Sequence, residues 1–270
     1  MTPVPARPTG LVLVFWLVGS LLLAFIVVPL IGLATTQSGG NLARVAAMPD
    51  VRLAIWLSLL AAFLTACWAA LLGIPLAYVL ARSEFRGKEI VSAIVDLPLA
   101  VPHTVAGIAL LIVFGRQGLI GGPADRIFGL QFWGTLAGVV AGMLFVSAPY
   151  TVNAAQIGFE AIDPRLEKVA RTLGLGPWRV LLRVTLPLAW RSIVTGLTLT
   201  YARAISEFAA VAILAYYPMT APVKIYELFL QFGLDESSGM ALLLLMVSLA
   251  LFIMFRHIAR RRRVFVGAGR

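Results

Sequence analysis

"VARTLGLGPWRVLLRVTLP", residues 169–187, is a basic, sharply punctuated segment that lies between two long apolar ones. It carries three arginines, and its second half is flanked by Pro177 and Pro187. Gly174 and Gly176 interrupt it before the first of these prolines. Glycine and proline are the residues that most often end helices. The segment therefore predicts short polar-faced helices rather than part of a membrane span.

The composition around this segment is that of an integral membrane protein. Of 270 residues, 60% are hydrophobic and 13% are charged, whereas soluble domains are about a quarter charged. The net charge of +10 would suggest nucleic acid in a soluble protein. Membrane proteins, however, collect Lys and Arg in their cytoplasmic loops. We therefore expect a lipid bilayer around the chain and no nucleic-acid partner.

The sequence offers little material for a catalytic or cofactor site. Cys67 is the only cysteine and lies in an apolar run, where a thiol usually serves packing. The two histidines and few carboxylates form no cluster at metal-ligand spacing. The GxxxxGK[ST] pattern of a nucleotide-binding loop is missing from the sequence. We expect no metal, no bound cofactor and no catalytic residue in this chain.

A helix needs about 20 mostly apolar residues to cross a bilayer. The sequence predicts one all-α membrane domain over residues 1–270 with six spans, at roughly 11–33, 53–81, 90–114, 132–157, 192–216 and 239–256. Arg7 before the first apolar run is also typical of a signal peptide. That run is longer than a typical signal-peptide core, so a retained helix is the preferred interpretation.

The distribution of Lys and Arg predicts the orientation of the chain. Segments 82–90, 158–191 and 256–270 hold three, six and six of these residues. The opposite loops hold only Arg44, Arg52, Arg116, Arg126 and Lys224. Positive loops face the cytoplasm, so both termini and segment 158–191 are expected there. Six spans with both ends on one side agree with this, and the predicted location is the inner (cytoplasmic) membrane.

The segment 158–191 predicts two short helices. Asp163 and Pro164 form a typical N-cap and first-turn pair, and Gly174 is a typical C-terminal residue of the first helix. One face of that helix is apolar, at Leu166, Val169, Ala170 and Leu173. Gly176 begins a second helix, which we expect to end at Pro187 before the fifth span. A basic amphipathic loop lying on lipid headgroups is the alternative interpretation.

The spacing resembles the cytoplasmic "EAA" loop of ABC-importer permeases, EAA-x3-G-x9-I-x-LP. The matching positions are Lys168, Val169, Ala170, Gly174, Val184, Leu186 and Pro187. In that family the loop is a coupling helix that docks in a groove of a separate ATPase subunit. The resemblance implies coupling roles for Asp163, Arg165, Leu166, Lys168, Val169, Ala170, Arg171, Gly174, Leu175, Gly176 and Trp178. Lys168 replaces the motif glutamate, and the adjacent Glu167 would point elsewhere on the helix.

Three further stretches are similar to the permeases of molybdate, tungstate and sulfate importers. They are "DLPLAVPHTVAGIALLIVFGRQGLIG" (96–121), "ARAISEFAAVAIL" (202–214) and "YYPMTAPVKIYELF" (216–229). Their sequences resemble the molybdate/tungstate branch most. The resemblance implies a homodimer with two ATPase subunits and an extracytoplasmic binding protein. ATP and Mg would be bound by the ATPase, and the oxyanion would cross by alternating access. The polar loop 115–131 would face the protein that delivers the ligand.

Charged residues inside a bilayer are costly and usually find partners within the bundle. Arg203 and Glu207 lie four residues apart, so one helix face holds both. They form either an internal ion pair or part of an anion pathway. His103, next to the helix-breaking Pro102, either bonds neighbouring helices in its neutral form or contacts the anion. The pathway candidates are His103, Thr104, Ser147, Arg203 and Glu207.

Two other classes of protein remain open. An ATP-independent secondary transporter would need coupling carboxylates at mid-membrane and inverted repeats. A non-transporting membrane scaffold would use the small-residue face formed by Gly134, Gly138 and Gly142, which lets another helix approach closely. We expect that face to pack within one subunit.

Overall fold

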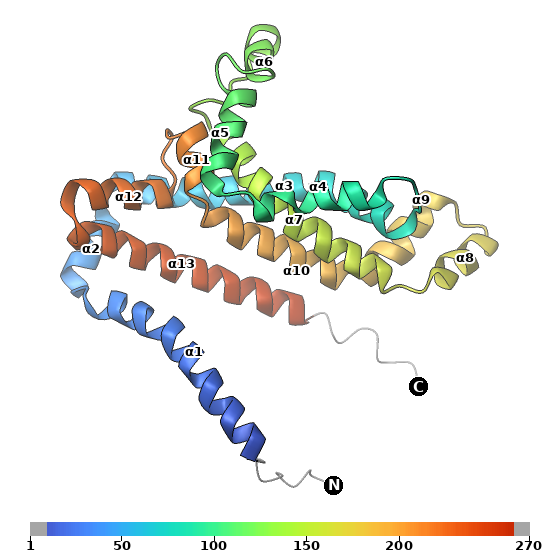
Figure 1. Cartoon of the computed structure of the whole chain (residues 1–270), viewed down its shortest axis with the longest axis horizontal. Helices are drawn as coiled ribbons and strands as arrows, with labels where there is room; N and C mark the ends of the chain where they lie inside the picture. Colours follow the sequence, from blue (N-terminus) through green and yellow to red (C-terminus); the bar gives the residue numbers. More distant parts are fainter. Residues whose placement is uncertain (1–9, 262–270) are drawn as a thin grey trace.

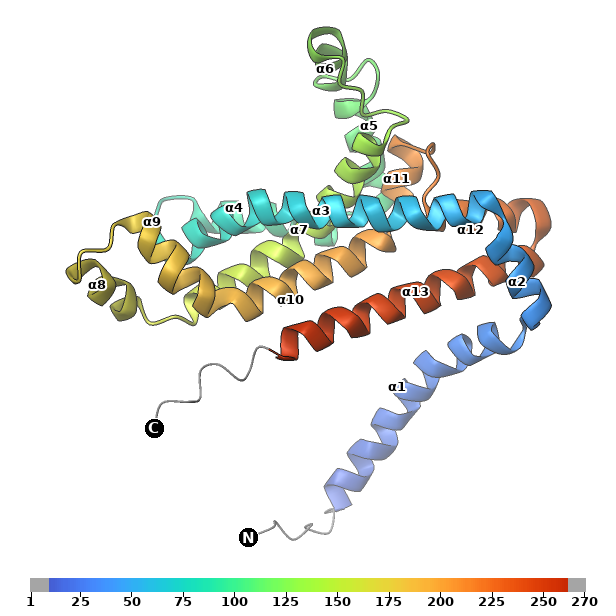
Figure 2. The same ribbon diagram turned by 180° about the vertical axis from the view of Figure 1, so that it is seen from behind.

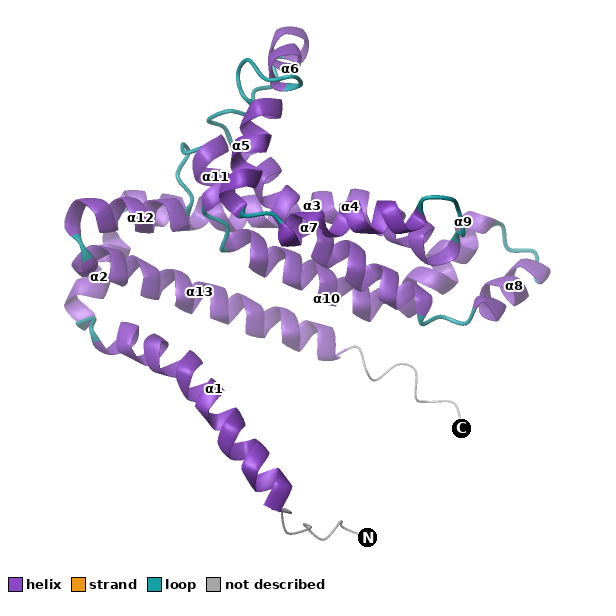
Figure 3. Ribbon diagram, viewed as in Figure 1, coloured by secondary structure: helices purple, strands orange, loops and turns teal. Residues whose placement is uncertain are grey.

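The computed structural model describes residues 10–261, and side chains through residue 254. In this part of the chain every regular element is a helix, and the connections are loops (Figure 3). The elements are α1 (Gly10–Thr35), α2 (Gly39–Ala47), α3 (Pro49–Arg82), α4 (Lys88–Ala100), α5 (His103–Phe114), α6 (Gly121–Phe128), α7 (Leu136–Glu160), α8 (Pro164–Thr172), α9 (Pro177–Val180), the π-helix η1 (Leu181–Thr185), α10 (Leu186–Ile205), α11 (Ala209–Leu214), α12 (Ala221–Phe232) and α13 (Leu234–Arg261).

The core is a bundle in which α7 packs against both α3 and α10. The bundle lies horizontally in Figure 1, with α8 and α9 at one end and α2 and α12 at the other. Helix α13 runs beside α10 in the antiparallel direction. The buried core side chains of α7 include Met143, Val152 and Phe159, as expected for the central helix of a bundle. This arrangement holds the α8–α9 end apart from the α5–α6–α11 group, which projects sideways (Figures 1 and 2).

Helices α7 and α10 approach closely because glycines lie at their contact. A Cβ atom on Gly196 would lie 2.8 Å from the Cβ of Ala154 and 3.0 Å from the carbonyl oxygen of Tyr150. A Cβ on Gly158 would lie 2.5 Å from the Cβ of Ser192. Small residues permit this approach in membranes, where packing rather than water exclusion joins helices.

We expect Gly196→Ala to lower the stability of the helical bundle. The added methyl group meets backbone of α7 as well as a side chain, and overpacking of this kind costs about 1–3 kcal/mol. Gly32→Ala in α1 is the matched control, because a Cβ there meets nothing within 4 Å. Thermal unfolding of the detergent-solubilised protein measures both variants. Equal midpoints for Gly196→Ala and Gly32→Ala would contradict the close contact.

The six predicted spans are observed in part. Over the described residues, five helices are long and apolar enough to cross a membrane, or up to six if the bent pair α4–α5 counts as one span. Within the predicted span 90–114 the helix-breaking effect expected of Pro102 is observed, because α4 and α5 are bent by 113° at a break there. Val101 has extended backbone geometry with ψ of 130°, which the following Pro102 favours. The proline therefore ends α4 and begins the turn into α5.

The prediction that Pro187 ends a separate second helix is wrong. Helix α9, the π-helix η1 and α10 form one continuous span, Pro177–Ile205. The amide of Leu186 donates to the carbonyl of Leu181, five residues back. This wider turn lets Pro187, which has no N–H, stand near the start of α10 without breaking the span. The span ends at Ile205 rather than near 216, and α11 follows it after a break.

The terminal regions differ in how they contact the bundle. Helix α1 has no buried residue and diverges from α13 in both views (Figures 1 and 2).

The small-residue face packs within the subunit, as predicted, because Gly138 and Gly142 of α7 lie against Ala215 and Val211. Gly134 precedes α7 and has a positive φ of 67°. Arg7 and the side chains of 256–270, on which the predicted orientation partly depends, lie outside the described residues.

Candidate functional site

Helix α8 begins and ends as its sequence predicts. The Asp163 carboxylate accepts a hydrogen bond from the amide of Arg165 at 2.9 Å, which caps the first turn. At the other end Gly174 adopts a φ of +86°. Its amide donates to the carbonyl of Arg171, and the amide of Leu175 donates to that of Ala170. This double closure is a Schellman motif, whose left-handed residue is usually glycine.

The apolar face of α8 points away from the protein. Leu166 is 49% exposed, Val169 57% and Leu173 79%, and we call these three residues the apolar face of α8. Ala170, on the edge of the same stripe, is buried. The charged Arg165, Lys168 and Arg171 are exposed too. A helix that presents both leucines and basic residues at the end of the molecule has the character of a docking surface.

The turn between α8 and α9 has one required glycine rather than two. Gly176 has a φ of −67° and ψ of 162°, which any residue adopts. Gly176 begins α9 as its N-cap residue, as predicted, and only Gly174 needs the left-handed conformation. Beyond the turn, Trp178 is 76% exposed and extends the exposed apolar surface onto α9.

Sequence reasoning missed an internal contact of α8. The Glu167 side chain is only 8% exposed and pairs with Arg82, the last residue of α3, at 3.0 Å. Glu167 was expected to point away from its neighbour Lys168, and it does, but into the bundle. In the sequence, Glu167 lies off the apolar stripe, a position that fits a solvent-exposed acid as well as a buried one. Only the folded structure identifies Arg82 as its partner.

A second group of polar side chains lies where α4 breaks into α5 and α10 breaks into α11. It consists of His103, Arg203 and Glu207 and is called here the charge cluster. Arg203 Nη2 lies 2.9 Å from Glu207 Oε2 and 2.9 Å from His103 Nε2, and His103 Nδ1 lies 3.1 Å from the same carboxylate oxygen. Arg203 Nη2 also lies 3.1 Å from His103 Nδ1, so the guanidinium contacts both ring nitrogens. Glu207 is 2% exposed, so its charge is compensated inside the bundle.

The charge cluster joins two broken helices. His103 is the first residue of α5, Arg203 lies in the last turn of α10, and Glu207 accepts a hydrogen bond from the amide of Ala210 in α11 at 2.9 Å. Gly107 lets α5 and α11 pack closely, since a Cβ there would lie 3.0 Å from the Cα of Ala210. The cluster thus fixes the α5–α11 pair to the end of α10.

The other two pathway candidates have different surroundings. Thr104 is exposed beside His103 at the start of α5. Ser147 is completely buried, and its hydroxyl donates to the carbonyl of Met143 in its own helix. Its carbonyl accepts from Thr200, which also bonds Thr151 at 2.6 Å. The structure therefore places Ser147 in the α7–α10 packing and apart from the charge cluster.

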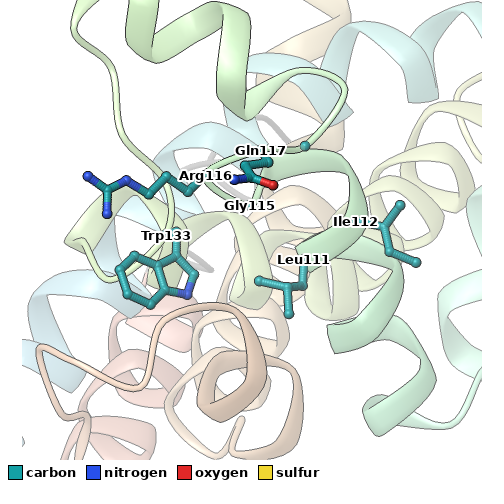
Figure 4. Close-up of a pocket in the computed structure, with 7 residues that line it drawn as sticks. Leu111, Ile112, Gly115, Arg116, Gln117 and Trp133 are labelled. Carbon is teal, nitrogen blue, oxygen red and sulfur yellow. The ribbon is translucent and has the colours of Figure 1, made fainter.

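A shallow cavity lies at the outer end of α5. It has a volume of about 340 Å³, and its lining includes Arg116, Gln117 and Trp133. Figure 4 shows the Arg116 and Trp133 side chains on the same side of this cavity, with Leu111 on the wall formed by α5. It belongs to the polar loop 115–131, which forms α6 at its tip. Over the described residues, no group of three His, Cys, Asp or Glu side chains has a metal-binding arrangement.

Comparison with known proteins decides the family. Residues 73–264 match the model of the binding-protein-dependent transport system inner membrane component. The chain belongs to this family of ABC-importer permeases. The matched range contains α8, the charge cluster and the polar loop, so each of these features lies within the shared permease architecture.

The permease is similar to curated relatives over most of its length. It is 44% identical over 250 residues to the molybdate/tungstate transport system permease protein WtpB of Thermococcus kodakarensis, which covers 92% of this chain and 96% of the relative. A probable sulfate transport system permease protein cysT of Chlorokybus atmophyticus is 38% identical over 200 residues, 71% of this chain and 69% of the relative.

The fold has solved counterparts. A bacterial ABC transporter involved in the import of the acidic polysaccharide alginate matches with a TM-score of 0.72 at 19% identity, covering 91% of this chain and 96% of that one. At this level of identity the likeness concerns the fold alone. The all-helical fold is therefore shared with a chain of a solved ABC transporter.

Proposed function

We propose that this permease forms the translocation pathway of an ATP-driven importer for molybdate or tungstate. The observation that carries the proposal is the 44% identity, over 92% of the chain, to a molybdate/tungstate permease. The net charge of +10 and a pathway candidate such as Arg203 suit a dianionic cargo.

The proposed coupling site is segment 158–191, with α8 at its centre. Two copies of a separate ATPase subunit, which hold ATP and Mg, bind the apolar face of α8 and the exposed Trp178 on two permease subunits. Exposed leucine, valine and tryptophan at the end of a helical bundle support this role, because they gain most from burial in a partner's groove. Lys168 is exposed beside them and replaces the family's acid with a cation.

The orientation follows from this coupling. The α8–α9 end and both termini face the cytoplasm, and the chain spans the inner membrane with a second copy of itself. An extracytoplasmic binding protein delivers the oxyanion to the polar loop 115–131. The cavity beside Arg116 and Trp133 supports that contact with an aromatic and a cation, both frequent at protein interfaces.

The proposed pathway passes His103, Thr104 and Arg203. Arg203 is 23% exposed at its side chain and is paired with Glu207, so its attraction for an anion is reduced. A weak contact suits transport, since a deep anion site would retain the cargo. Ser147 is not part of this pathway, because its side chain is enclosed in the α7–α10 packing.

Reconstitution in proteoliposomes tests the proposal. The permease, its ATPase and its binding protein are expected to take up labelled tungstate only with ATP and Mg, and excess molybdate is expected to compete strongly while sulfate does not. Equal competition by sulfate would favour the sulfate alternative, which the relative from Chlorokybus supports. Uptake that persists without ATP would contradict the proposal and favour a secondary transporter.

A further inference from the structure

We propose that Glu167, Arg82 and Thr185, called here the α8 anchor, transmit the movement of α8 to the membrane bundle. The proposal rests on the proposed function, because it concerns the route by which an ATPase moves this permease. Glu167 is a positioning residue: it contacts no cargo and acts through the helices that it joins.

The anchor is a buried polar network at the α8–α9 end of the bundle. Glu167 Oε1 accepts hydrogen bonds from Arg82 Nε at 3.0 Å and from the Thr185 hydroxyl at 3.0 Å. Arg82 Nη2 lies 3.0 Å from the same oxygen and donates to the carbonyl of Ile162 at 3.2 Å. One carboxylate therefore joins α8 to the end of α3 and to the π-helix η1.

Burial makes this network a rigid connection. The Arg82 and Glu167 side chains are 13% and 8% exposed, and Thr185 is completely buried. Breaking a buried pair leaves an uncompensated charge, so the three groups hold one arrangement rather than exchanging with water. Exposed ion pairs, in contrast, contribute little and break readily.

The two faces of α8 therefore have separate tasks. Leu166, Val169 and Leu173 face outward, where a partner binds, and Glu167 faces inward, where the bundle begins. Helix α3 and the η1–α10 span both pack on α7. A displacement of α8 thus reaches both helices that flank the central helix. Without the anchor, α8 is joined to the bundle by its chain connections and by its contacts with α9 and η1.

The test compares Glu167→Gln with Glu84→Gln in the complete complex of permease, ATPase and binding protein. Glutamine keeps the size of the side chain but removes its charge. Glu84 is the matched control because it also pairs with a cation in the neighbouring 82–90 segment, Lys88 at 2.8 Å, but is 89% exposed. We expect Glu167→Gln to lower tungstate uptake per ATP hydrolysed by about tenfold, a typical size for coupling between sites. Glu84→Gln is expected to keep the wild-type ratio.

A second variant separates positioning from simple misfolding. The exchange Arg82→Glu with Glu167→Arg restores an ion pair in reversed order, and we expect it to recover part of the uptake-to-hydrolysis ratio that each single change loses. The amount of assembled complex, measured by co-purification of the ATPase, normalises every variant. A wild-type ratio in Glu167→Gln, or losses of uptake and hydrolysis in equal proportion, would overturn the anchor. Failure of the wild-type complex to couple uptake to ATP would instead contradict the proposed function.

Discussion

Replacing Gly174 by valine is expected to reduce ATP-driven uptake to background while the protein still inserts in the membrane. Gly174 has a φ of +86°, and the left-handed region costs an L-residue about 1–2 kcal/mol, more when it is β-branched. The valine therefore opens the Schellman closure and turns the apolar face of α8 away from its docking position. Uptake by proteoliposomes and membrane integration of the variant are the two measurements.

Gly176→Val is the matched control for this prediction. Gly176 is two residues away and equally unobstructed, since a Cβ at either glycine meets nothing within 4 Å. Its φ of −67° is ordinary, so valine adopts it without strain. Normal uptake in Gly174→Val, or equal losses in both variants, would show that backbone conformation at Gly174 does not control coupling.

Removing the Arg203 side chain is expected to have the second large effect. Arg203→Ala leaves the Glu207 carboxylate, which is 2% exposed, without its cation. Loss of one partner from a buried pair lowers the free energy of unfolding by about 3–5 kcal/mol. The connection between α10 and the α5–α11 pair weakens at the same time, so transport is expected to fall with stability.

Two comparisons make the Arg203 prediction specific. Arg203→Lys keeps the positive charge and is expected to retain most of the thermal stability. Any loss of uptake in this variant measures the contribution of the planar guanidinium group, which lysine lacks. Arg191→Ala, at the other end of α10, removes an exposed arginine and is expected to change little. Thermal unfolding and uptake at the wild-type level in Arg203→Ala would exclude both the structural and the pathway role of this residue.

The sequence contains strong signals for the long helices and for the ends of α8. Asp163 as a cap and Gly174 as a left-handed closure act through neighbouring backbone groups, so a few residues are sufficient to predict them. The break at Pro102 was also visible, because proline acts on the residue before it. The 113° bend there depends on how α5 packs on α11, which no local pattern specifies.

Other features depend on residues far apart in the chain. The break after Ile205 has no proline or glycine to mark it, and it is held by Glu207, which caps the following turn and pairs across to α5. Glu167 and Arg82 are separated by 85 positions, so only the folded bundle brings them together. Apolar periodicity predicted the face of α8 but did not determine whether that face points inward or outward.

The most direct measurement is protection of single cysteines against a maleimide in a Cys67→Ser background. Leu173→Cys in the α8 turn and Leu119→Cys in the loop before α6 are matched, with 79% and 78% exposure of the native leucines. The ATPase subunit is predicted to protect position 173 and leave position 119 labelled, and the loaded binding protein is predicted to do the reverse. Labelling of position 173 that is unchanged in a complex retaining the ATPase would contradict docking on the apolar face of α8.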